Sequence, residues 1–241
     1  MQYLYSPSDD FSDLASGAVL HGGGGFTNFP VRLAREVFLR AARHVDTRPL
    51  SVWDPCCGCG YLLAVLGLLC PGMIARIYAS DVDERALDTA RRNLALLSRG
   101  GMRRRVEELR GRSAFDAAER LLAGMGDAGP EARVFRRDIL RPEPADFQAL
   151  NPSFDVGADI VITDVPYGGL AQWSGLEDPG EDALAALLRN IAPALRTGSA
   201  VAVCSDRRQK IHTETLAALG YVRAEREQVG KRRFEIVRWV G

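Results

Sequence analysis

The sequence is poor in lysine and histidine and has no excess charge of either sign. Lys210 and Lys231 are its two lysines, so arginine supplies nearly all of the 31 basic residues, which 31 acidic residues balance. A net charge of zero argues against a protein whose whole surface attracts polyanions. Arginine nevertheless offers a planar fork of donors for phosphate and a flat face for bases. Binding of a nucleic acid would therefore depend on local arginine clusters.

Long apolar runs and paired cysteines are also missing. No run of about 18 apolar residues is present, so the sequence predicts no membrane span. The first residues, MQYLYSPSDDFSDL, lack the basic start and apolar stretch of a secretion signal. The cysteines number five, and three of them crowd into CCGC at 56–59, which argues against disulfides. We expect a cytoplasmic protein.

The CCGC segment does not predict a metal site either. A zinc or iron–sulfur site needs further ligands at workable spacing. Cys70 and Cys204 lie far from the segment along the chain, and the three histidines are scattered. We therefore expect no metal.

Short apolar runs alternate with helical patterns from about residue 50 onward. Five runs read as strands that end at or next to an aspartate, with helical patterns between most of them: 50–54, 73–81, 132–138, 158–164 and 198–206. This alternation predicts a parallel sheet with helices on both faces. Two further segments, YVRAEREQVG at 221–230 and KRRFEIVRWV at 231–240, read as strands joined through Gly230 and Lys231, which would leave one strand antiparallel. The predicted fold class is α/β, with a doubly wound, mostly parallel seven-stranded sheet and a C-terminal antiparallel hairpin strand.

Two regions fall outside this repeat. Residues 1–43 precede the first strand and are interpreted as an N-terminal extension with a helix that packs on the core. Residues 44–241 form the main domain, in which about 99–130 is too long for an ordinary connection and reads as a helical insertion.

The loop after the first strand, DPCCGCG, is typical of a nucleotide or nucleoside cofactor site. Gly58 and Gly60 let the backbone approach a ligand closely, and Asp81 follows about 20 residues later, the spacing of a ribose-binding acid. The third glycine of a dinucleotide loop is replaced by Leu63. Asp54, before the glycines, would repel a pyrophosphate but attract a methionyl ammonium group. We therefore predict S-adenosylmethionine as the cofactor.

Two further residues belong to this predicted cofactor site. Cys56 lies in the loop itself, and Asp138 follows the third strand, where its carboxylate could accept a hydrogen bond from the adenine amino group. A surface aspartate remains the alternative for Asp138.

The stretch DIVITDVPYGG at 159–169 predicts a second chemical site, at the end of the fourth strand. Asp164, which is also counted with the cofactor-binding residues, could accept hydrogens from a base nitrogen and stabilise positive charge there. Pro166 would stiffen the following turn, and Tyr167 offers a ring on which a flipped base can stack. These three residues are the predicted catalytic set. The alternative is an ordinary turn with Tyr167 partly in the core.

These motifs resemble those of known enzymes. DPCCGCG is similar to the DPxCGxG opening of class I (Rossmann-like) methyltransferases that act on nucleic acids. DVPYG resembles their [DN]PPY[GF] loop, with Val165 in place of the first proline. FTNFPVRLAREVFLRAAR, ASDVDERALDTARRNLALLSRGGMRRR and VITDVPYGGLAQWSG together resemble the actinomycete avilamycin-resistance rRNA methyltransferase family.

The resemblance implies the reaction. The family methylates one guanine base of large-subunit 23S rRNA with S-adenosylmethionine, which blocks an orthosomycin antibiotic. It favours the ring nitrogen at position one over the exocyclic amine, and Asp164 would then act as the proton acceptor. The alternatives are a DNA adenine or protein-amide methyltransferase with the same loop, or a non-catalytic RNA-binding protein with a vestigial cofactor fold.

An RNA substrate, as ribosomal RNA or a ribosomal particle, needs a positive track despite the zero net charge. Three clusters are candidates, although each is more often solvated surface: Arg103, Arg104 and Arg105; Arg207 and Arg208; and Lys231, Arg232 and Arg233. Asn28, Phe29 and Arg32 could close over the cofactor or base, with Phe29 equally an apolar anchor. We expect a monomer.

Overall fold

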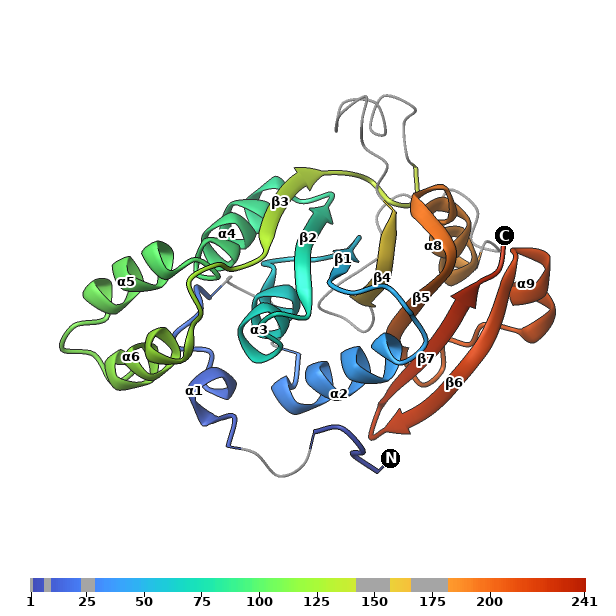
Figure 1. Ribbon diagram of the computed structural model, residues 1–241. Coiled ribbons are helices and arrows are strands. Elements are labelled where there is room, and N and C mark those ends of the chain that lie inside the picture. The colour runs from blue at the N-terminus through green and yellow to red at the C-terminus, as the bar shows by residue number, and fades with distance from the viewer. Residues whose placement is uncertain (1, 7–9, 23–28, 142–156, 166–181) are drawn as a thin grey trace.

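A computed structural model describes residues 2–6, 10–22, 29–141, 157–165 and 182–241 (Figure 1). Seven strands form one sheet in the order β3-β2-β1-β4-β5-β7-β6. The strands are β1 (Leu50–Asp54), β2 (Ile74–Asp81), β3 (Glu131–Arg136), β4 (Ala158–Asp164), β5 (Leu195–Asp206), β6 (Tyr221–Val229) and β7 (Arg232–Trp239). The first five strands pair in parallel, and β7 is antiparallel to both β5 and β6. The predicted fold class, with its C-terminal hairpin, is confirmed.

The helices lie on both faces of the sheet. They are α1 (Ser12–Ala15), α2 (Val31–Ala42), α3 (Tyr61–Leu69), α4 (Glu84–Ala95), α5 (Arg99–Glu108), α6 (Phe115–Gly124), α8 (Ala183–Ile191), the 3-10 helix η1 (Ala192–Ala194) and α9 (Thr213–Ala218). None of the helices in the described residues has the length and apolar character that a membrane crossing requires.

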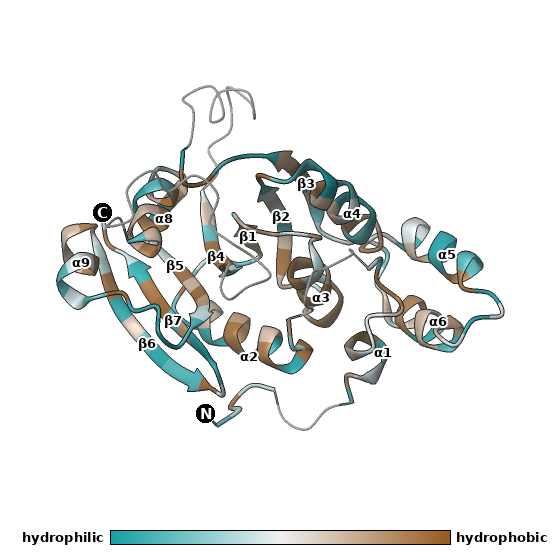
Figure 2. Ribbon diagram, turned by 180° about the vertical axis from the view of Figure 1, so that it is seen from behind, coloured by the Kyte–Doolittle hydropathy of each residue, from teal (hydrophilic) through white to brown (hydrophobic). Residues whose placement is uncertain are grey.

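Two apolar cores hold these layers together. One face of the sheet, with Val52, Ile160 and Ile162, packs against α2, α3 and α4. The other face, with Trp53 and Val161, packs against α8 and α9. Side chains of successive residues in a strand point to opposite faces, so β1 and β4 must be apolar throughout. Figure 2 shows the apolar residues of α3 and of the central strands in brown.

The helices α5 and α6 lie beyond the β3 edge of the sheet, and the hairpin of β6 and β7 lies at the other edge (Figure 1). The N-terminal segment reaches both regions. The Tyr61 hydroxyl donates to the Leu14 carbonyl at 2.9 Å, and Arg105 Nε donates to the Val19 carbonyl at 2.7 Å.

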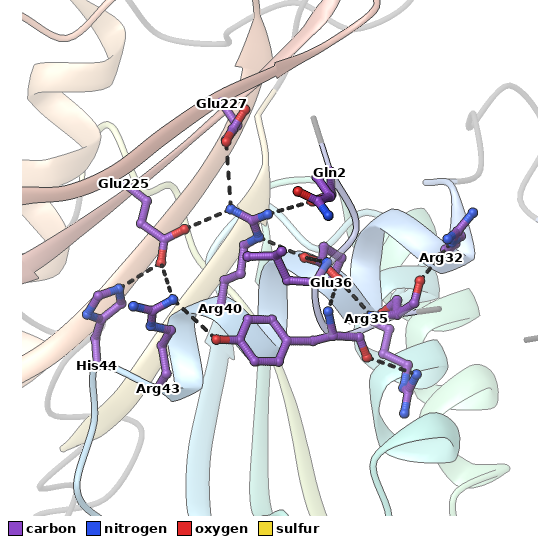
Figure 3. Close-up of polar contacts among 12 residues, drawn as sticks. Gln2, Arg32, Arg35, Glu36, Arg40, Arg43, His44, Glu225 and Glu227 are labelled. Carbon is purple, nitrogen blue, oxygen red and sulfur yellow. Dashed lines mark hydrogen bonds and ion pairs between the residues drawn. The ribbon is translucent and has the colours of Figure 1, made fainter. Parts of the chain in front are cut away.

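The first residues are bound to α2 by a buried ionic cluster (Figure 3). The Glu36 carboxylate accepts the N–H groups of Leu4, Tyr5 and Ser6, each at 2.8 Å. Arg40 pairs with Glu36 at 2.8 Å and with Glu225 of β6 at 3.0 Å, and it donates to the Gln2 carbonyl at 2.7 Å. The start of the chain is thereby tied to α2 and to the edge strand β6.

Candidate active site

Three aspartates lie at the carboxyl ends of β1, β2 and β4, where a doubly wound sheet places its ligands. Asp54 is 2% exposed, while Asp81 and Asp164 are half-buried. Burial is the main reason why the pKa of Asp54 is raised to about 8; the neighbouring charges of Asp81 and Asp164 act in the same direction, and the hydrogen bond from the Cys56 N–H acts against them. The sequence-predicted acids are therefore close enough to interact. A cationic ligand suits this arrangement, because its positive charge would favour release of the proton that Asp54 otherwise holds.

The loop after β1 is wound tightly onto β2. The Cys56 N–H donates to Asp54 Oδ1 at 3.0 Å, and the Gly58 N–H donates to Asp81 Oδ2 at 2.8 Å. Gly60 has φ +71°, and a Cβ atom there would lie 3.0 Å from Ala90 Cα and Cβ. Glycine is needed at this position both for its conformation and for the close approach of α4.

Asn93 is a site residue that the sequence analysis missed. Its side chain is fully buried, and Nδ2 donates to the carbonyls of Cys59 at 2.8 Å and His21 at 3.1 Å. Its Oδ1 accepts the His21 N–H at 2.7 Å. One amide thus joins α4, the glycine loop and the N-terminal segment. The signal in the sequence was an asparagine on the mostly apolar face of a helix.

Asp138 lies two residues beyond the end of β3 and is half-buried. Its Oδ1 accepts the N–H groups of Leu140 at 3.0 Å and Arg141 at 3.2 Å, which shapes a turn. The pKa of the Cys56 thiol is raised well above its usual value, chiefly by burial and also by the charges of Asp54, Asp81 and Asp138. Asp138 therefore lies near the loop after β1, and the region around Asp54, Asp81, Asp138 and Asp164 is called the crevice below.

The cysteines of the loop are poor nucleophiles. Burial raises the pKa of the Cys56 and Cys57 thiols well above the usual value, which disfavours the reactive thiolate. Within the residues that the structure describes, no three His, Cys, Asp or Glu side chains are grouped for a metal ion.

The end of β4 explains the departure from a double-proline loop. Asp164 lies opposite Cys204 of β5, and the next N–H, of Val165, donates to the Cys204 carbonyl at 2.9 Å. A proline at this position could not make that bond, because it has no N–H group. Val165 thus extends the pairing of β4 by one residue. The predicted catalytic residues Pro166 and Tyr167 lie outside the described residues.

Comparisons with known proteins agree with this geometry. The family model described as rRNA methyltransferase AviRa matches residues 1–232. The chain belongs to this family. A 23S rRNA (guanine(2535)-N(1))-methyltransferase from Streptomyces viridochromogenes is 42% identical over 95% of this chain and 92% of that protein.

Solved structures support the family assignment. The rRNA methyltransferase AviRa from Streptomyces viridochromogenes matches with a TM-score of 0.82 and 37% identity, over 99% of this chain and 96% of that one. A ribosomal protein L11 methylase from Lactobacillus delbrueckii subsp. bulgaricus matches with a TM-score of 0.53 and 14% identity, over 90% of this chain and 81% of that one. The second match reflects the shared methyltransferase fold alone.

The predicted RNA-binding clusters of this AviRa-family chain lie in two places. The Arg207 N–H donates to the Lys231 carbonyl at 2.9 Å, and Arg232 lies opposite Asp206. The fold therefore joins the second and third clusters at the carboxyl edge of the sheet. The first cluster is on α5, which lies beyond the edge strand β3 (Figure 1).

Arg105 differs from its neighbours in the α5 cluster. Arg103 and Arg104 are exposed, whereas the Arg105 side chain is 14% exposed. Its guanidinium donates to the Val19 carbonyl and pairs with Glu108 at 3.0 Å. Because these contacts occupy donors of Arg105, the exposed Arg103 and Arg104 are the members of this cluster that are most accessible to a ligand.

Phe29, just before α2, and Arg32, in its first turn, already have partners within the protein. Phe29 is buried, with 4% exposed, and the Arg232 guanidinium lies 5.5 Å from its ring centre. Arg32 Nε donates to the Ser6 carbonyl at 2.8 Å and its guanidinium stacks 4.0 Å from the Tyr3 ring centre. Phe29 is therefore an anchor that also contacts a predicted RNA-binding arginine. Asn28 lies outside the described residues.

Proposed function

We propose that this protein transfers a methyl group from S-adenosylmethionine to N1 of a guanine in 23S rRNA. The proposal rests on family membership and on the relative whose name gives this reaction. We further propose that the modification protects the ribosome against avilamycin-type orthosomycins, and that the protein acts in the cytoplasm as a monomer.

The observation that carries the proposal is the convergence of three carboxylates on one crevice. S-adenosylmethionine, when bound, supplies a methyl group on a positively charged sulfonium. Asp54 is suited to the methionyl ammonium because it is buried beside two further acids. The half-buried Asp81 carboxylate, at the end of β2, is placed for the ribose hydroxyls. The glycine loop allows a ligand close to its backbone, and Asp138 is assigned to the adenine amino group.

Asp164 is proposed as the proton acceptor. Guanine N1 carries a hydrogen that must leave when the nitrogen gains a methyl group. The half-buried carboxylate at the end of β4 is proposed to receive it, because a general base must lie at the strand end where the acceptor base is expected. Tyr167 is proposed to stack on the flipped base, and Pro166 to stiffen the turn that presents it.

The proposed RNA track comprises the α5 pair and the cationic residues at the carboxyl edge of the sheet: Arg103, Arg104, Arg207, Arg208, Lys231, Arg232 and Arg233. Phosphate contacts from such residues would fix the position of the RNA rather than read its sequence.

The test is methylation of purified 23S rRNA with labelled S-adenosylmethionine, followed by primer extension. A methyl group on N1 blocks Watson–Crick pairing and stops reverse transcriptase, whereas a single methyl group on the exocyclic amine still permits pairing. We expect a stop at one guanine, and turnover reduced by about 10²–10⁴-fold in Asp164→Asn. Calorimetry with S-adenosylhomocysteine checks that this variant still binds cofactor.

Two results would contradict the proposal. Full turnover in Asp164→Ala would remove the carboxylate from the mechanism, and methylation of DNA or protein but not rRNA would change the substrate class. Growth of a susceptible host in avilamycin, with wild type or Asp164→Asn expressed, tests the resistance.

A further inference from the structure

A pocket of about 340 Å³ lies outside the crevice, at the hairpin of β6 and β7. Its walls come from the hairpin and from the segment between β5 and α9. The lining residues are Lys210, Arg226, Arg233, Glu227 and Gln228. Lys210, Arg226 and Gln228 belong to none of the motifs or basic clusters that the sequence predicted.

The pocket has an excess of positive charge. Many arginines elsewhere are neutralised by a carboxylate, as Arg120 is by Asp13. Across the described ranges, Lys210, Arg226 and Arg233 have no such ion pair. The carboxylate of Glu227 lies 3.9 Å from Arg40 Nη1, on the side of the buried ionic cluster (Figure 3). The three cations are therefore available to an anionic ligand.

Contacts with the backbone hold the pocket in place. Arg233 Nη1 donates to the Gln209 carbonyl at 3.1 Å, and Gln228 Nε2 donates to the Gly230 carbonyl at 3.1 Å. The Arg207 N–H donates to Lys231 at 2.9 Å and ties the segment after β5 to the hairpin. A ligand would thus meet donors that are already partly ordered, which lowers the entropic cost of binding.

The strand register gives the position of the pocket relative to Asp164. Asp164 lies opposite Cys204, Cys204 lies opposite Phe234, and Phe234 lies opposite Glu227. Three strand spacings of about 4.8 Å make a separation of about 14 Å. A stacked nucleic-acid strand rises about 3.4 Å per nucleotide, so this separation corresponds to about four nucleotides.

We propose that this pocket binds a backbone phosphate of the RNA strand, about four nucleotides from the methylated guanine. The inference rests on the proposed function, because it takes the substrate to be RNA. Arginine donates to phosphate oxygens as a fork, lysine acts as a point charge, and the glutamine amide adds a neutral donor. Such a contact fixes the register of the strand and leaves base recognition to the crevice.

The experiment compares Lys210→Gln, Arg226→Gln and the double variant with wild type. The probe is a 23S rRNA transcript that the wild-type protein methylates, and its Kd is measured at several salt concentrations. Loss of one phosphate contact should lower the slope of log Kd against log salt by about 0.7–0.9. At 0.1 M salt, this change in slope corresponds to an affinity about sixfold weaker. Because both side chains contact the same phosphate, the double variant should approach this loss and each single variant should show a smaller part of it. Circular dichroism checks that each variant is folded.

Arg238→Gln is the matched control. Arg238 is exposed and lies on β7, five residues beyond Arg233 and opposite Val222, so its removal deletes the same charge away from the pocket. Its Kd and salt slope should equal those of wild type. An equal loss in Arg238→Gln would reduce the effect to general surface charge and overturn the proposal.

Competition with inorganic phosphate, compared with chloride at the same ionic strength, tells whether the pocket binds a phosphate of the RNA backbone or only free phosphate. It should compete with RNA for wild type and not for the double variant. If wild type methylates rRNA and the double variant binds it with unchanged Kd and slope, the pocket proposal is wrong and the proposed function stands. Phosphate binding without any change in RNA affinity would also overturn it. Failure of wild type to bind or methylate rRNA would instead overturn the proposed function.

Discussion

Asp81 Oδ2 accepts the Gly58 N–H at 2.8 Å, and this bond joins the end of β2 to the loop after β1. Its Oδ1 atom accepts the Asp83 N–H at 3.0 Å. One carboxylate therefore orders two segments of the crevice while it faces the proposed ribose site. A hydrogen bond to a charged group contributes about 1.5–3 kcal/mol.

We expect Asp81→Asn to weaken binding of S-adenosylhomocysteine by about 10–100-fold, because the amide replaces a charged acceptor with a neutral one. Calorimetry on the purified protein measures this. Asp83→Asn is the control: Asp83 caps α4 through the Arg85 N–H at 2.9 Å, and asparagine caps a helix as well as aspartate. Equal affinity of Asp81→Asn and wild type would remove Asp81 from the cofactor site.

The sequence predicted the sheet well because each strand is an apolar run with clear limits. The predicted limits of β1 and β4 agree with the structure at both ends. The helical pattern of EDALAALLRNIAPAL at 181–195 extends beyond the helix itself: α8 ends at Ile191, and Pro193 lies in η1 because it cannot continue the hydrogen bonding of an α-helix.

The polar contacts between distant segments were not predictable. Asn93 and His21 are far apart in the sequence, as are Arg40 and Glu225, and hydrophobic periodicity carries no information on such pairs. The acids of the crevice were predictable because strand ends in a parallel sheet meet at one edge. The role of Arg105 was not predictable, because a run of arginines does not tell which side chain turns inward.

The pKa of Asp54 gives a prediction for the pH dependence of stability. The folded protein holds this proton up to about pH 8, whereas an unfolded chain releases it near the usual carboxyl value of 3.8. Between these values unfolding releases one proton, so the free energy of unfolding falls as the pH rises. The contribution of one proton is about 1.36 kcal/mol per pH unit.

Asp54→Asn should remove this contribution, because asparagine has no proton to release. Urea denaturation between about pH 5 and pH 8 should show a flatter decline for the variant than for wild type. The exposed Asp83→Asn should keep the wild-type slope. Parallel slopes for wild type and Asp54→Asn would mean that Asp54 is ionised in the folded protein at neutral pH.

Asn93 should position the glycine loop. We expect Asn93→Asp to destabilise the protein by about 1–3 kcal/mol, because a carboxylate cannot donate to the Cys59 and His21 carbonyls and would repel them. Cofactor affinity should fall while turnover at saturating cofactor changes little, since Asn93 acts through the loop. Denaturation and the separate KM and kcat values for S-adenosylmethionine measure both effects. A change in kcat alone would contradict a positioning role.

The α5 cluster should separate RNA binding from stability. Reversal of Arg103 and Arg104 to glutamate should weaken rRNA binding and flatten its salt dependence with little effect on the melting temperature, because both side chains are exposed. Arg105→Gln should lower the melting temperature instead, since it loses its bonds to the N-terminal segment. Filter binding and thermal denaturation make the comparison. The opposite pattern would restore Arg105 as the RNA contact.

The ionic cluster of Figure 3 should be the strongest polar contribution to the attachment of the N-terminal segment. Burial alone would raise the pKa of Glu36, but Arg40 and three backbone N–H groups hold it below its usual value. Arg40→Met would leave this buried carboxylate without its cation, at a cost of about 3–5 kcal/mol. Arg43→Met removes a 49% exposed side chain 3.8 Å from Glu225 and should cost less than about 1 kcal/mol.

Hydrogen exchange should show faster exchange at Leu4, Tyr5 and Ser6 in Arg40→Met alone, since their shared acceptor is Glu36. Equal free energies of unfolding for the two variants would show that the N-terminal segment is held mainly by apolar contacts.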